Sequence, residues 1–148
     1  MITFEATTEI AADAATVWST LVDTAHYADW DSGVIGVEGE VALGNRIRVT
    51  SAVNPGRAFP AKVTTLDEPR TMVWSGGMPL GLFKGVRTFT IEDVPAGTRF
   101  TMREVFSGPM LKLIARTLPD LQPSFDQFVA GLRAEVEHTA SHTSEQGA

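Results

Sequence analysis

Two neighbouring segments, 83–92 and 98–107, alternate apolar and polar residues with a period of two. This alternation is typical of strands that bury one face. The linker 94–97 reads Val-Pro-Ala-Gly, a composition and length common in hairpin turns. Closing the hairpin there places Arg87 opposite Glu104, whereas a shift of one residue would set apolar against polar faces. The pattern therefore predicts an antiparallel hairpin and its register.

The core face of this hairpin carries one pair of opposite charges. Its other members are apolar: Phe83, Phe89, Ile91, Phe100, Met102 and Phe106. Buried charge is costly unless it is paired, so we expect Arg87 and Glu104 to contact each other. The pair is either a structural ion pair or a polar anchor for the carboxylate, carbonyl or phenol of a ligand. These two residues are the candidates for a catalytic role, and the sequence leaves both interpretations open.

The composition excludes several classes of protein. With 148 residues the chain is expected to form one domain, and its net charge of −6 without a basic stripe argues against nucleic-acid binding. There is no cysteine and no calcium-loop spacing, and His138 and His142 lie at or beyond the end of the last predicted helix, so we expect neither metal nor other cofactor. No apolar run is long enough to span a membrane, and no signal peptide is apparent. The expected location is cytoplasmic.

The rest of the chain divides into strands followed by helices. Periodicity and turn residues predict a strand over 2–10, a helix over 14–23 capped by Asp13, a short helix or turn over 24–31, strands over 33–40, 45–52, 58–67 and 71–77, the hairpin, and helices over 110–118 and 120–138. We expect one domain over 1–138. The polar segment 139–148 is expected to be a disordered tail.

The long predicted helix carries a continuous apolar stripe. It consists of Leu121, Phe125, Phe128, Leu132 and Val136. A sheet with one polar face needs cover on the other, and this helix is the element that can supply it. We therefore predict an α+β fold with a curved antiparallel sheet around the helix. Such a sheet commonly leaves a concave apolar pocket, the usual setting for a small ligand.

Several motifs resemble the START-like, helix-grip superfamily, also called SRPBCC. They are Ala-Ala-Thr-Val-Trp at 14–18, Tyr-Ala-Asp-Trp-Asp at 27–31, Val-Thr-Thr-Leu-Asp-Glu-Pro-Arg at 63–70, and Leu-Pro-Asp-Leu-Gln-Pro-Ser-Phe at 118–125. Within the superfamily, the chain resembles polyketide cyclase/dehydrase-like bacterial members. The resemblance implies about seven strands wrapped around the C-terminal helix, with two short helices after the first strand. It does not imply one chemistry, because the superfamily includes ligand carriers, cyclases and protein-binding modules.

The candidate ligand-binding residues combine the charged pair with large apolar side chains expected near the pocket. They are Trp74, Met78, Phe83, Arg87, Phe89, Met102, Glu104, Phe106, Met110, Phe125, Phe128 and Leu132. Most of the aromatic and methionine residues among them can equally be core. The glycine-flanked apolar loop 76–83 is a candidate gate at the pocket mouth, with Met110, Leu111 and Ile114 as the opposite lip.

Three functions remain open. The first is binding of a lipophilic small molecule between the sheet and helix 120–138. The second is a polyketide cyclase/dehydratase-type enzyme that holds a flexible substrate in reactive geometry. The third is a protein-interaction module with a collapsed pocket, in the manner of chaperone-activating relatives. The expected oligomeric state is a monomer or a homodimer.

Overall fold

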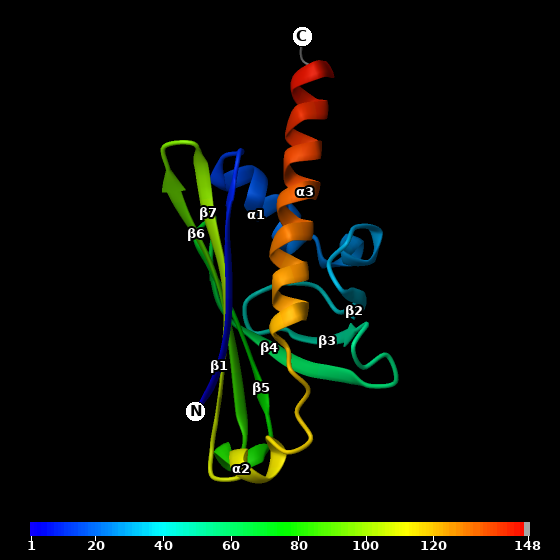
Figure 1. Cartoon of the computed structure of the whole chain (residues 1–148), viewed down its shortest axis with the longest axis vertical. Helices are drawn as coiled ribbons and strands as arrows, with labels where there is room; N and C mark the ends of the chain where they lie inside the picture. The colour runs from blue at the N-terminus through cyan, green and yellow to red at the C-terminus, as the bar shows by residue number, and fades with distance from the viewer. Residues whose placement is uncertain (147–148) are drawn as a thin grey trace.

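The computed structural model describes residues 1–146 and contains one antiparallel sheet of seven strands in the order β1-β7-β6-β5-β4-β3-β2. The strands are β1 (Ile2–Ile10), β2 (Val34–Glu38), β3 (Arg46–Ser51), β4 (Ala58–Asp67), β5 (Thr71–Gly77), β6 (Lys84–Val94) and β7 (Gly97–Ser107). The helices are α1 (Ala14–Val22), α2 (Leu111–Ile114) and α3 (Gln122–Gln146), with 3-10 turns η1 (Thr24–Asp29) and η2 (Pro79–Gly81). The sheet curves around one side of α3 (Figure 1). The predicted helix-grip α+β fold is confirmed.

The hairpin of β6 and β7 has the predicted register. Arg87 lies opposite Glu104, and the two pairs beyond it are Phe89 with Met102 and Ile91 with Phe100. The apolar members of these pairs are all buried. The period-two pattern therefore correctly predicted which face of each strand is buried and which residues of the two strands lie opposite each other.

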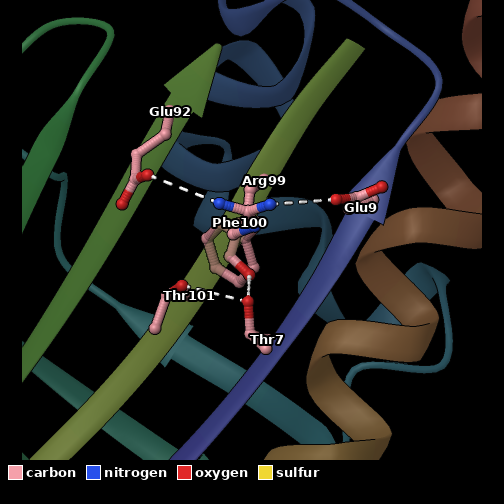
Figure 2. A network of polar contacts seen from close by, with 6 residues as sticks. All are labelled: Thr7, Glu9, Glu92, Arg99, Phe100 and Thr101. Carbon is pink, nitrogen blue, oxygen red and sulfur yellow. Dashed lines mark hydrogen bonds and ion pairs between the residues drawn. The ribbon is translucent and has the colours of Figure 1, made fainter. Parts of the chain in front are cut away.

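The outer face of the sheet is polar. Arg99 on β7 reaches Glu9 on β1 at 3.1 Å and Glu92 on β6 at 3.9 Å, and Thr7 donates a hydrogen bond to the carbonyl of Phe100 (Figure 2). These side chains are exposed, so each ion pair contributes at most about 1 kcal/mol. The buried side of the sheet is the one that packs on α3.

Helix α3 buries the predicted stripe against the sheet. Phe125, Phe128, Leu132 and Val136 are buried, while Leu121 is half-buried at the start of the helix. Gly131 brings the helix close to the segment after η1, because a Cβ there would collide with the carbonyl oxygen of Asp31. Beside this contact, the side-chain amide of Gln127 donates to Asp31 Oδ1 at 2.7 Å.

The α1–η1 unit closes one end of the core. Asp13 caps α1 by accepting from the Thr16 amide at 2.9 Å. Tyr27 is buried, and its hydroxyl donates to the carbonyl of Leu21. Its ring packs edge-on against Trp30 and Phe128. Burial raises the pKa of the Tyr27 phenol, which therefore stays neutral.

The C-terminal third differs from the predicted bounds in two places. The helix expected over 110–118 is only the single turn α2, and residues 115–117 form a turn in which the hydroxyl of Thr117 donates to the Ile114 carbonyl. The backbone of α3 continues through Gln146, so most of the expected tail 139–148 continues the helix, and 147–148 lie outside the described residues. The domain boundary at 138 stays a prediction. None of the helices within 1–146 is both long and apolar enough to cross a membrane.

Candidate functional site

A cavity of about 550 Å³ lies between the sheet and the first turns of α3. Its volume falls in the range of about 300 to 1,000 Å³ that is typical of small-molecule sites. Strands β3 to β7 form its floor, and the β3–β4 turn and the segment 114–119 complete the wall. Nine predicted residues line it: Trp74, Met78, Phe83, Arg87, Met102, Glu104, Phe106, Phe125 and Phe128.

Three predicted residues do not line the cavity. Phe89 packs among the rings of Trp74, Phe100 and Phe128, and Leu132 lies deeper in the core, two turns beyond Phe125. Met110 is half-buried beside the loop 79–82, where its amide donates to the Leu82 carbonyl at 2.9 Å. The helical stripe identified core positions correctly but did not show where the sheet and α3 diverge.

One wall of the cavity contains no residue that the sequence pattern predicted. This wall comes from the β3–β4 turn and the start of β4, and it includes Val53, Asn54, Arg57 and Phe59. Residues 52–57 of the turn show no period-two alternation, so periodicity gave no reason to place the turn at a pocket. Strand order contained the signal, since antiparallel strands bring this turn to the same end of the sheet as the loop 76–83.

An ion pair forms the strongest polar feature of the lining. Arg87 Nη2 donates to Glu104 Oε2 at 2.8 Å, and the two side chains are 24% and 12% exposed. The guanidinium carbon of Arg87 also lies 5.0 Å from the ring centroid of Phe125, within reach of a cation–π interaction. The carboxylate and the aromatic ring together hold the Arg87 head group against the cavity wall.

Two residues of this wall each carry a buried hydrogen-bond donor without a partner. Among the described residues, Arg87 Nε and Trp74 Nε1 are buried and unpaired. Trp74 on β5 lies directly opposite Arg87 on β6, so both donors come from one cross-strand pair. A buried donor without a partner costs about 1 to 3 kcal/mol, which makes such groups rare in folded proteins.

Gly85 keeps the wall open beside Glu104. A Cβ at this position would lie 3.0 Å from Phe106 Cε1 and 3.6 Å from Glu104 Oε1. Phe106 in turn stacks on Phe83, with ring centroids 5.6 Å apart. A larger residue at position 85 would therefore press on the aromatic pair and cover the second carboxylate oxygen.

Ionisable groups are few in the lining. They are Arg57, Arg87 and Glu104, so Glu104 is the one acidic side chain on the cavity wall. Among the side chains that the structure describes, no three histidine or acidic groups come together as metal ligands would. The chemistry that this lining can perform is hydrogen bonding by the donors and proton transfer through Glu104.

The predicted gate lies at the cavity mouth only in part. Met78 and Phe83 line the cavity, whereas Leu80 at the tip of the loop points into solvent. On the opposite lip Ile114 lines the cavity, and Met110 and Leu111 do not. Opening and closing of this loop stays a prediction.

A family model described as "Polyketide cyclase / dehydrase and lipid transport" matches residues 1–137. The chain belongs to this family. The predicted membership of the START-like superfamily is thereby confirmed. No curated protein matches the chain.

Solved structures of the same fold come from several bacteria. An aromatase/cyclase (ZhuI) from Streptomyces sp. R1128 is 17% identical with a TM-score of 0.71, over 94% of this chain and 95% of that one. A START superfamily protein from Mycobacterium smegmatis is 19% identical with a TM-score of 0.67, over 93% and 98% of the two chains. A protein from Mesorhizobium loti is 17% identical with a TM-score of 0.71, over 93% and 98%. Identities this low establish the common fold alone.

Proposed function

We propose that the cavity binds a lipophilic small molecule that carries a neutral hydrogen-bond acceptor, such as a ketone or a phenol. The observation that carries this proposal is the pair of buried, unpartnered donors on a largely apolar wall, Arg87 Nε and Trp74 Nε1. Both nitrogens are covered by protein atoms, so an acceptor atom of a ligand reaches them once the Arg87 or Trp74 side chain shifts. It would then satisfy donors that otherwise cost about 1 to 3 kcal/mol each. The apolar lining would cover the hydrocarbon or aromatic body of the ligand.

The charge of the wall favours a neutral acceptor over a carboxylate. Glu104 already neutralises Arg87 at 2.8 Å, so the pair has no net charge to offer an anion. A ligand carboxylate would also approach the Glu104 carboxylate, and like charges at short range repel each other. A carbonyl oxygen meets the free donors without this penalty.

Two ligands of similar shape test the polar anchor. They are 2-acetylnaphthalene and 2-ethylnaphthalene, which lacks the oxygen, and their affinities are measured by displacement of the uncharged dye N-phenyl-1-naphthylamine. We expect the ketone to bind about tenfold more tightly, the effect of one well-formed hydrogen bond in a dry site. Arg87→Met and Trp74→Phe should each bring the two affinities closer together. Arg103→Met, an exposed change on β7 outside the lining, should preserve the difference.

Two outcomes would count against the proposal. Equal affinities of the wild-type protein for the ketone and the hydrocarbon would show that the buried donors do not bind the ligand oxygen. Failure of both ligands to displace the dye would show that the cavity does not bind ligands of this class. The open cavity itself disfavours the third function, an interaction module with a collapsed pocket.

A cyclase-type enzyme is the second candidate, and the free oxygen of Glu104 beside Gly85 supports it. In such a reaction Glu104 would take a proton from a carbon between two carbonyl groups of a poly-β-ketone. The resulting carbanion would attack another carbonyl carbon of the same chain, and the new alkoxide beside Arg87 would take the proton back before water is lost. The family description and the aromatase/cyclase neighbour are compatible with this chemistry.

Turnover separates the enzyme from the carrier. The substrate is the N-acetylcysteamine thioester of a linear poly-β-ketone, and the readout is the absorbance of an aromatic product. An enzyme should lose at least about a hundredfold in rate in Glu104→Gln, while this variant still binds 2-acetylnaphthalene. A product rate equal to that of buffer alone would reject the cyclase and leave the carrier. A rate above buffer that is unchanged in Glu104→Gln would reject Glu104 as the base.

A further inference from the structure

Exposed apolar side chains gather at one end of the molecule. Six of the nine large apolar residues that are exposed lie in the segments around the cavity mouth: Val53, Phe59, Met78, Leu80, Leu82 and Leu113. The loop containing η2 and the turn α2 lie side by side at the end of the long axis opposite the C-terminus (Figure 1). Leu80 on η2 and Leu113 on α2 are 96% and 61% exposed. We call this end, formed by residues 78–84 and 110–113, the apolar tip.

Neither packing against other residues nor the backbone preference of leucine explains why position 80 carries a leucine. Almost nothing covers its side chain, and its φ of +61° lies in the left-handed region. That region costs a residue with a Cβ about 1 to 2 kcal/mol and suits glycine or asparagine. A strained, uncovered leucine at a loop tip points to a role outside the folded core.

The segments around the tip and the mouth are basic, although the chain is acidic overall. Residues 52–61, 76–86 and 106–119 contain Arg57, Lys84, Lys112 and Arg116 and no acidic residue. Among the described residues, none of these four takes part in an ion pair. The exposed carboxylates of Glu9, Glu92 and Asp93 lie at the other end of the sheet, around the β6–β7 turn. The molecule therefore presents a positive end with apolar side chains.

We propose that the apolar tip docks on the surface of an anionic lipid bilayer. Single leucines that project from short loops beside lysines match the apolar–polar boundary of a bilayer, where the leucines insert and the lysines meet lipid phosphates. A protein partner would need a continuous, well-packed face of about 800 Å², and the apolar groups here project from separate loops. A second copy would meet the same positive charge. Docking in this orientation would turn the cavity mouth toward the lipid, but it does not depend on what the cavity binds.

Sedimentation with lipid vesicles tests the docking. The full chain is mixed with vesicles of phosphatidylcholine alone or with one quarter phosphatidylglycerol, at low salt and at 0.5 M salt. We expect binding to the anionic vesicles that high salt weakens strongly. Leu80→Asn should weaken it about tenfold through lost apolar insertion, and Lys84→Gln with Lys112→Gln about 25-fold through two lost charges.

Matched controls separate the tip from general effects. Leu43→Asn removes another exposed leucine, 66% exposed on the β2–β3 loop, and should change binding less than twofold. Arg46→Gln with Lys62→Gln removes the same charge from a cross-strand pair on β3 and β4, and it should weaken binding much less than the lysine pair at the tip. Leu80→Asn should melt at the same temperature as the wild type or higher, because asparagine tolerates the left-handed backbone.

Three results would overturn the proposal. One is equal sedimentation with neutral and anionic vesicles, and another is unchanged binding by Leu80→Asn. The third is absence of binding to either vesicle, which would leave an acidic protein as the occupant of this surface. Binding of the naphthalene ligands is measured separately, so failure at the tip is distinguishable from failure of the cavity.

Discussion

Arg87 is held on the cavity wall by three different neighbours. It shares an ion pair with Glu104, lies over the ring of Phe125 and stands opposite Trp74 in the sheet. Its Nε is the part that no described neighbour satisfies. The structural and the ligand-binding interpretations therefore concern different nitrogen atoms of one side chain, and both can hold.

Removing the charge of Arg87 tests the structural part. Arg87→Met should lower the free energy of unfolding by about 2 to 3 kcal/mol, because it leaves the Glu104 carboxylate unpaired on a poorly hydrated wall. The double variant Arg87→Met with Glu104→Leu should recover at least half of that loss, since no buried charge remains. Equilibrium unfolding in urea measures both. A double variant as unstable as the single one would assign the loss to packing on Phe125.

At the scale of elements, the position of α3 depends on one close backbone contact. Gly131 lies against the Asp31 carbonyl, and Gln127 bonds the Asp31 side chain one turn earlier. The contact fixes the helix against the segment that follows η1. The cavity begins nearer the N-terminus of α3, where Ser124 and Phe125 face the sheet across open space.

Gly131→Ala tests this contact by the sign of its effect. In an exposed helix interior this change stabilises by about 1 kcal/mol through helix propensity. At position 131 the new methyl group would collide with the Asp31 carbonyl, so we expect a loss of about 1 to 3 kcal/mol instead. Urea unfolding measures it, with Ala134→Gly at an exposed position of α3 as the propensity control. A stabilised Gly131→Ala would show that α3 does not approach Asp31 this closely.

The cap of α1 predicts a pH dependence. Hydrogen bonds from the hydroxyl and amide of Thr16 lower the pKa of Asp13 below its usual 3.8. A lowered pKa in the folded state adds stability above pH 3.8, and this stability is lost as the pH falls through the lowered value. Thermal melts of Asp13→Ala should therefore lie below the wild type at pH 7 and approach it at the most acidic pH that permits folding. A difference that does not change with pH would contradict the charged cap.

For the molecule as a whole, sheet and helix form a wedge that is packed at one end and open at the other. The closed end holds Tyr27, Leu132 and the α1–η1 unit, and the open end contains the cavity of about 550 Å³, with Phe128 between them. Because interiors are otherwise close-packed, so large a space is typical of a site that a ligand fills.

Filling this space should separate binding from stability. Ser124→Phe places a ring in the cavity from the first turns of α3, so we expect displacement of the naphthalene dye to be lost while the melting temperature stays within a few degrees. Ala134→Leu on the exposed side of the same helix adds bulk outside the cavity and should leave binding intact. Dye fluorescence and a thermal melt give the two readouts. Unchanged dye binding by Ser124→Phe would place the dye elsewhere.

The sequence by itself determined the strand faces, the register of Arg87 with Glu104 and the buried stripe of α3. Each depends on periodicity within one segment or on one short turn, and such local patterns are readable without the fold. Only the tertiary structure decided that Trp74 lies opposite Arg87 and that Phe89 and Leu132 belong to the packed core. It also decided that the β3–β4 turn forms a cavity wall and that Leu80 is uncovered at the apolar tip. These facts depend on distances between segments far apart in the chain, which the angle between the sheet and α3 sets and no local pattern encodes.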